Sequence, residues 1–109
     1  MLRFRGQLPF DPTLYSETVT VYHREGLTRQ VLEGVHWEKT QNRTVENGIT
    51  QDREAFLLVI PYDTAPDIGD KLWEGIGPEA AWGDVNAPTV ATRKRRTFRG
   101  KFSHWEVRG

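Results

Sequence analysis

The sequence contains no cysteine among its 109 residues. Disulfide bonds and cysteine-ligated zinc sites are therefore excluded. Long apolar stretches are missing as well, because the longest run is Ala55–Ile60, far below the roughly 20 residues that span a bilayer. We therefore expect a protein that makes no use of a membrane.

Net charge is also absent, since 15 basic residues balance 15 acidic ones. This balance argues against a protein that binds nucleic acid over its whole surface. The cations are unevenly placed, however, and six of them fall within nine residues: Arg93, Lys94, Arg95, Arg96, Arg99 and Lys101. Such a basic run can contact phosphates or an acidic protein surface, or it can protect an edge strand against aggregation.

Residues with catalytic chemistry are scarce. Ser16 and Ser103 are the only serines, and neither lies in a nucleophile-elbow sequence. Ser103 precedes His104, but neighbours on a strand point to opposite faces, so we expect no dyad between them. The three histidines have no metal-ligand spacing. These absences predict a protein that is not an enzyme and holds no cofactor or metal.

Carboxylates occur in two close pairs, Asp52 with Glu54 and Asp67 with Asp70. A hydrolase needs such a pair in a cleft. Both pairs flank turns, where acidic residues are common for local hydrogen bonding. We therefore interpret them as structural.

The remaining pattern has a period of two, and no helical period runs for more than about two turns. Strands are expected over Glu17 to Tyr22, Arg29 to about Lys39, Glu54 to Tyr62, Lys71 to Glu74, Thr89 to Phe98 and Ser103 to Arg108. Gly34 lies inside the second of these and indicates a bulge or a close backbone approach. The fold class that follows is all-β, a small antiparallel barrel or sandwich of about six strands.

Turn residues divide the chain further. Pro9 and Pro12 break regular structure, so residues 1–16 are interpreted as an irregular N-terminal arm and residues 17–109 as a single β-barrel domain. The polar stretch 40–53 carries Asn47 and Gly48, the strongest short signal for a hairpin turn. We expect a flexible hairpin or loop there that extends from the body.

The order of these segments resembles a known family. The telling pieces are Thr-Val-Thr-Val-Tyr at 18–22, Val-Leu-Glu-Gly-Val-His-Trp-Glu-Lys at 31–39, the Asn-Gly hairpin, Gly-Asp-Lys-Leu-Trp-Glu-Gly at 69–75 and Ser-His-Trp-Glu-Val at 103–107. Over residues 17–109 the chain resembles the small head–tail connector proteins of tailed bacteriophages, the head-closure (stopper) or minor capsid proteins.

The resemblance implies a virion structural protein at the neck, assembled first in the host cytoplasm. Its partners would be further copies in a ring, a portal or adaptor protein, and a tail or tail-completion protein. A loop of each subunit would project toward the axial channel, help to close it, and make sequence-independent contact with packaged DNA. The hairpin at 40–53 is the best match for that loop, with Arg43, Glu46, Asn47 and Gln51 toward the lumen.

Four tryptophans are more than a core of this size usually needs, and tryptophan is enriched at interface hot spots. Trp82, Trp105 and Phe10 are the candidates for contact between subunits. The alternative function is a small nucleic-acid-binding β-barrel that uses the basic strand at 93–101.

Overall fold

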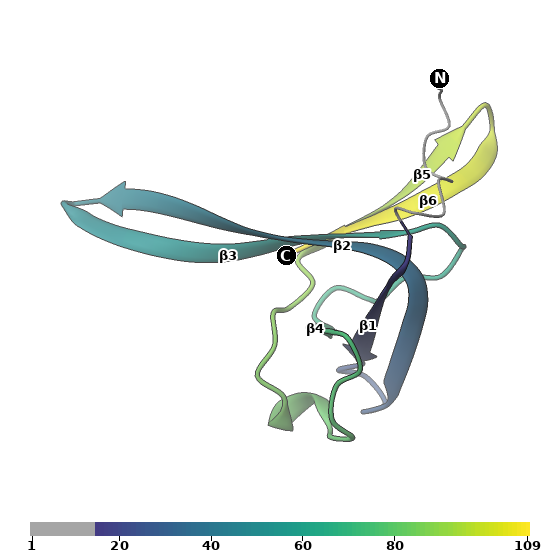
Figure 1. Ribbon diagram of the computed structural model, residues 1–109, viewed down its shortest axis with the longest axis horizontal. Helices are drawn as coiled ribbons and strands as arrows, with labels where there is room; N and C mark the ends of the chain where they lie inside the picture. Colours follow the sequence, from purple (N-terminus) through teal and green to yellow (C-terminus); the bar gives the residue numbers. More distant parts are fainter. Residues whose placement is uncertain (1–14) are drawn as a thin grey trace.

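Six antiparallel strands form one sheet in the order β4-β1-β2-β3-β6-β5 (Figure 1). The computed structural model describes residues 15–109, without the side chains of residues 41–44, 46 and 51–54. The strands are β1 (Glu17–Tyr22), β2 (Arg29–Glu46), β3 (Ile49–Ile60), β4 (Lys71–Glu74), β5 (Thr92–Phe98) and β6 (Lys101–Arg108). A single 3₁₀ turn, η2 (Trp82–Asp84), is the one helical element among the described residues. The predicted all-β antiparallel fold is confirmed.

The sheet is not closed into a barrel, because β4 and β5 lie at its two ends. Strand β2 joins its two halves. Residues 29–35 of β2 pair with β1, and residues 36–46 pair with β3. Figure 1 shows β2 bending sharply between these two stretches, so the sheet folds over on itself.

Gly34 lies at that bend. Glu17 faces Val35 and Thr18 faces Glu33, so Gly34 is an extra residue in the ladder. Its φ of 69° lies in the left-handed region, which glycine adopts without the steric cost that a side chain would bring. A bulge bends its strand and increases the local twist. The bulge predicted at Gly34 is therefore confirmed, and it accounts for the change of direction in β2.

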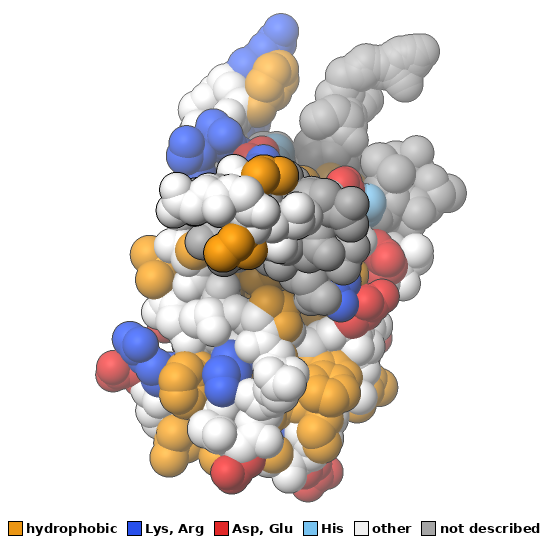
Figure 2. All heavy atoms as spheres, turned by 90° about the vertical axis from the view of Figure 1, so that its left-hand side faces the viewer, with side chains coloured by type: hydrophobic (Ala, Val, Ile, Leu, Met, Phe, Trp, Pro, Cys, Tyr) orange, Lys and Arg blue, Asp and Glu red, His pale blue; other side chains and the backbone are white. Residues whose placement is uncertain are grey.

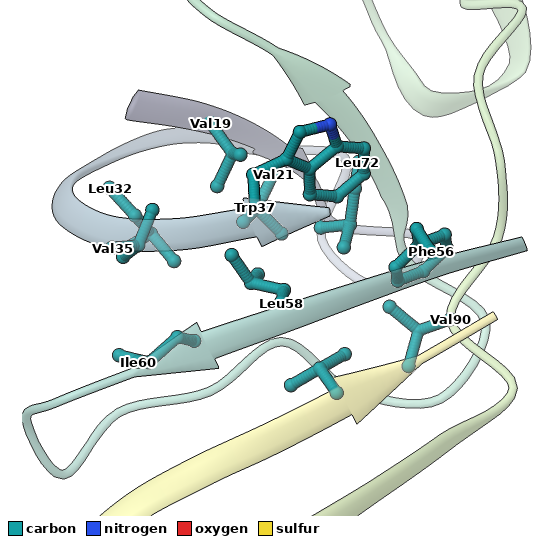
Figure 3. Packing of buried hydrophobic residues seen from close by; sticks show 11 residues of the cluster. Val19, Val21, Leu32, Val35, Trp37, Phe56, Leu58, Ile60, Leu72 and Val90 are labelled. Atoms are coloured by element: carbon teal, nitrogen blue, oxygen red, sulfur yellow. The ribbon is translucent and has the colours of Figure 1, made fainter. Parts of the chain in front are cut away.

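The core fills the space between the two halves of the folded sheet. Figure 3 shows Val19 and Val21 of the first half on the same side of the core as Leu72, facing Leu58 of the second half, where Trp37 pairs with Leu58. The cluster consists of Val19, Val21, Leu32, Val35, Trp37, Phe56, Leu58, Ile60, Leu72, Val90 and Val107. Each large apolar side chain buried in this way contributes roughly 1.5–3 kcal/mol relative to an exposed one.

Strands β2 and β3 are longer than the sequence pattern predicted. The prediction ended one strand at about Lys39, began the next at Glu54, and left 40–53 as a flexible hairpin or loop. The ladder instead continues to the pair Glu46 and Ile49 beside the turn. Polar residues can form strands here because the hydrogen bonds of an antiparallel ladder join backbone groups, which every residue type except proline carries in full.

The loop between β4 and β5 packs back on the first half of the sheet. Leu72 N–H donates to the carbonyl of Pro88, and Val90 N–H donates to that of Asp70. Lys71 also pairs with Thr89 in a single bridge. The outer edge of β4 is therefore covered by the chain itself. No helix in the part of the chain that the structure describes is long and apolar enough to cross a bilayer.

Candidate functional site

The end of the β2–β3 hairpin is the first predicted site. Asn47 and Gly48 have φ angles of 52° and 76°, the positive values that a type I′ turn requires, so the predicted turn is confirmed. The hairpin extends well beyond the other strands of its half of the sheet (Figure 1). Val45 and Ile49 beside the turn are 69% and 61% exposed. Figure 2 looks at the hairpin end-on and shows hydrophobic side chains on its surface.

The four predicted channel-loop residues all lie in this last part of the hairpin. Glu46 pairs with Ile49, and Gln51 pairs with Thr44 two positions further from the turn. Arg43 pairs with Asp52, and Asn47 is exposed in the turn itself. The side chains of Arg43, Glu46 and Gln51 lie outside the described part of the structure. Their backbone positions thus lie close together, and their direction toward a channel lumen stays a prediction.

The predicted basic strand is β5, which lies at one end of the sheet and pairs on one side only, with β6. All seven of its residues are exposed. Because side chains alternate along a strand, the cations of β5 divide between two faces. Arg93 and Arg95 lie opposite Val107 and Trp105, whereas Lys94 lies opposite Glu106.

Arg93 and Arg95, which we call the inner cations of β5, both contact the loop that follows β3. Arg93 Nη1 lies 3.1 Å from both the carbonyl oxygen of Pro66 and the carboxylate of Asp67. Arg95 donates to both carboxylate oxygens of Asp63, at 3.1 Å and 2.7 Å. The two guanidinium groups also stand 5.0 Å and 4.9 Å from the ring centres of Trp105 and Phe102. Arg93 and Arg95 therefore fasten a loop to the sheet.

Asp63 is the carboxylate on which this contact depends. It also accepts a hydrogen bond from Trp105 Nε1 at 2.9 Å. The hydrogen bonds from Arg95 and then from Trp105 hold the pKa of Asp63 below its ordinary value, because they favour the charged form. Sequence reasoning missed Asp63, because it lies 32 positions from Arg95 and no local pattern connects the two.

The outer face of β5 and β6 carries the cations that remain. Lys94, Arg96 and Arg108 border a hollow of about 200 Å³, together with Thr92, Arg93 and Glu106. Glu106 is the only carboxylate that borders it among the described side chains. Arg96 and Arg108 share that carboxylate, at 3.3 Å and 3.9 Å. Lys94 forms no ion pair with any described side chain, so this face keeps an excess of positive charge.

The last two predicted cations lie at the end of the β5–β6 hairpin. Arg99 occupies the turn with φ of 53° and stands 5.2 Å from the ring centre of Phe98. Lys101 pairs with Phe98 at the start of β6 and is exposed. The basic run thus divides into an inner pair, an outer face and a hairpin end, and Arg93 borders both the inner contacts and the outer hollow.

Ser103 and His104 contradict the prediction that they could not meet. Ser103 Oγ lies 2.8 Å from His104 Nδ1. The reason is a bulge: Arg96 faces His104 and Thr97 faces Phe102, so Ser103 is an extra residue in β6. A bulge redirects side chains that would otherwise alternate.

His104 in turn positions Glu106. His104 Nε2 lies 3.0 Å from Glu106 Oε2. This hydrogen bond, followed by that of Arg96, holds the pKa of Glu106 below its ordinary value. The chain Ser103, His104 and Glu106 therefore keeps a negative carboxylate among the cations of the outer face.

Two of the three predicted interface residues, Trp82 and Trp105, are in contact with their own domain. Trp82 Nε1 donates to the carbonyl of Gly69 at 2.8 Å, and Lys71 Nζ stands 4.1 Å from the ring centre. Trp105 is held by Asp63 and Arg93. Both are only partly buried, so a role between subunits stays a prediction. Phe10 lies outside the described residues.

Of the two carboxylate pairs, the structure describes the side chains of Asp67 and Asp70, and these two carboxylates have different partners. Asp70 is 2% exposed and accepts from Arg24 N–H and Asp67 N–H, while Asp67 faces Arg93. The side chains of Asp52 and Glu54 lie outside the described part. Among the described residues no group of three histidine, aspartate or glutamate side chains is arranged to hold a metal ion.

Comparison with known proteins adds no relative. The chain matches no protein-family model, no curated protein and no solved structure.

Proposed function

We propose that this chain is a structural protein of the head–tail junction of a tailed bacteriophage. It assembles there as a ring between the portal or adaptor protein and the tail. The β2–β3 hairpin projects toward the axial channel and helps to close it. In this role the protein binds and assembles, and it turns over no substrate.

The observation that carries the proposal is the free end of the β2–β3 hairpin. A two-stranded ribbon has no core of its own and is marginal in water. This one nevertheless continues to Glu46 and Ile49 and exposes two apolar side chains at its tip. Such a ribbon would become more stable if its exposed apolar side chains were buried against a neighbouring molecule. The segment order that resembles phage connectors supports the same reading.

Electron microscopy of the particle tests the assignment. We expect density for this chain as a ring at the neck, with the hairpin directed inward. Density at the tail tip or on the capsid surface would overturn the assignment. Labelling with a small tag inserted at Gly26, which is exposed in the β1–β2 turn with open space around it, identifies the chain without altering the hairpin.

The nucleic-acid-binding alternative has less support. Two of its six cations, Arg93 and Arg95, already face Asp67 and Asp63. A third, Arg96, faces Glu106. A salt series of single-strand DNA binding tests it, because binding through phosphates falls steeply with salt. Tight, salt-sensitive binding that is lost on changing Arg95 and Arg96 to alanine would favour the alternative.

A further inference from the structure

Strand β5 is an edge strand of the described sheet, and it carries an unusual charge. An edge strand presents backbone N–H and C=O groups that can pair with another strand. The opposite edge, β4, is closed by residues 88–90 of the same chain. Within the described residues, β5 pairs only with β6. It is therefore the edge at which a further strand can add.

The charge of β5 decides what can add there. Four consecutive cations, Arg93 to Arg96, lie on this strand. A second copy of β5 would place like charges opposite one another, which is destabilising. A strand of opposite charge would instead be attracted and correctly oriented.

The two faces of β5 differ in charge, and this difference determines where an added strand can carry acidic residues. On the inner face, Asp63 and Asp67 already neutralise the two arginines, so a further carboxylate would meet negative charge. On the outer face, Lys94 has no acidic partner among the described side chains, and Arg96 and Arg108 share Glu106. Since successive side chains alternate, acidic residues two positions apart would both face the outer hollow.

We propose that β5 binds an extended acidic protein segment by strand addition. The segment has carboxylates at alternate positions, which face Lys94 and Arg96, and uncharged residues between them. Backbone hydrogen bonds to the open edge supply the docking, and the alternation of charge supplies the selectivity. The inference goes beyond the neck assignment and does not depend on it.

The test uses the full chain and a synthetic nine-residue peptide of alternating glutamate and threonine. The matched peptide carries glutamine in place of each glutamate. We expect the acidic peptide to bind about tenfold more tightly than the glutamine peptide. Hydrogen exchange then shows whether the peptide binds by strand addition, because strand addition slows the exchange of amide protons in β5. Failure of the acidic peptide to bind, or binding without slower exchange in β5, overturns the proposal.

Two variants of the chain and a nucleic acid test whether binding is selective for the charge of β5. Lys94→Glu removes a cation that has no ion pair among the described side chains, and it should weaken binding of the acidic peptide about tenfold. Arg24→Glu makes the same charge change on the β1–β2 turn and should leave binding unchanged. Equal loss in both variants means attraction by overall charge and contradicts the proposal. Single-stranded DNA that protects β5 amides as strongly as the peptide does would also contradict it. None of these outcomes bears on the position of the protein in a virion.

Discussion

The carboxylate of Asp63 receives two hydrogen bonds from the guanidinium of Arg95, at 3.1 Å from Nε and 2.7 Å from Nη2. This contact joins the loop after β3 to the edge strand β5. Arg95 belongs to the basic run that the sequence suggested as a binding surface, but in the fold it has a structural role.

The first prediction concerns acid stability. Hydrogen bonds and charges hold the pKa values of Asp63 and Glu106 below their ordinary values of 3.8 and 4.5 in the folded protein. The folded state therefore binds fewer protons than the unfolded state in this range, and stability rises with pH there. The stabilisation is present above about pH 4.5 and is lost as pH falls through the lowered folded-state pKa values.

Urea unfolding between pH 3 and 6 measures this dependence. The variants Asp63→Asn and Glu106→Gln should each flatten the slope. Asp84→Asn is the control, because the described side chains offer its exposed carboxylate no cation. An unchanged slope in the double variant would refute the assignment of these two groups.

The second prediction concerns Gly77, where the chain passes close to the core. A methyl group at this position would collide with Tyr22 Oη and lie 2.9 Å from Trp73 Cγ. Gly77→Ala should destabilise the fold by about 2 kcal/mol or more, because overpacking forces neighbours out of place. Gly83→Ala is the matched control, since its methyl group would meet nothing within 4 Å. Thermal unfolding of the two variants would disprove the close approach if their melting temperatures agreed.

The third prediction concerns Asp70, a buried carboxylate at the start of β4. It accepts hydrogen bonds from two backbone amides, at 3.0 Å each, and lies 2.8 Å from His23 Nδ1. Asp70→Ala leaves these partners without an acceptor and should reduce the free energy of unfolding by roughly 3 kcal/mol. Chemical denaturation measures the loss, with Asp84→Ala as the exposed control. A loss below about 1 kcal/mol would show that the network contributes little.

The fourth prediction rests on the neck assignment. Changing Val45 and Ile49 together to serine removes the apolar side chains of the hairpin tip. Because both are exposed, the fold should lose less than about 0.5 kcal/mol. The particles should retain less DNA, measured as genome content after purification. Ile76→Ser is the control, since Ile76 is 73% exposed on the loop after β4. Full DNA retention by the double variant would count against the hairpin as a channel element.

The candidate surfaces were predicted from the sequence only in part. The positions of the hairpin turn, the basic strand and the bulge at Gly34 follow from local rules on turns, charge and backbone freedom. The partners of the cations do not, because Asp63 reaches Arg95 only when a loop and an edge strand come together. Ser103 and His104 were placed on opposite faces, since the bulge that brings them together carries no signal of its own.

The sequence by itself determined the core segments of the strands, the turns and the alternation that separates core from surface, because these depend on neighbours along the chain, but it did not show that β2 and β3 continue as paired strands through 40–53. The tertiary structure alone decided that β2 bends from one half of the sheet to the other, that residues 88–90 cover β4, and that β5 is the other edge of the described sheet. It also decided which of the described cations form ion pairs. Strand order and ion pairing depend on contacts between residues far apart in the sequence, and these exist only once the sheet has folded over its core.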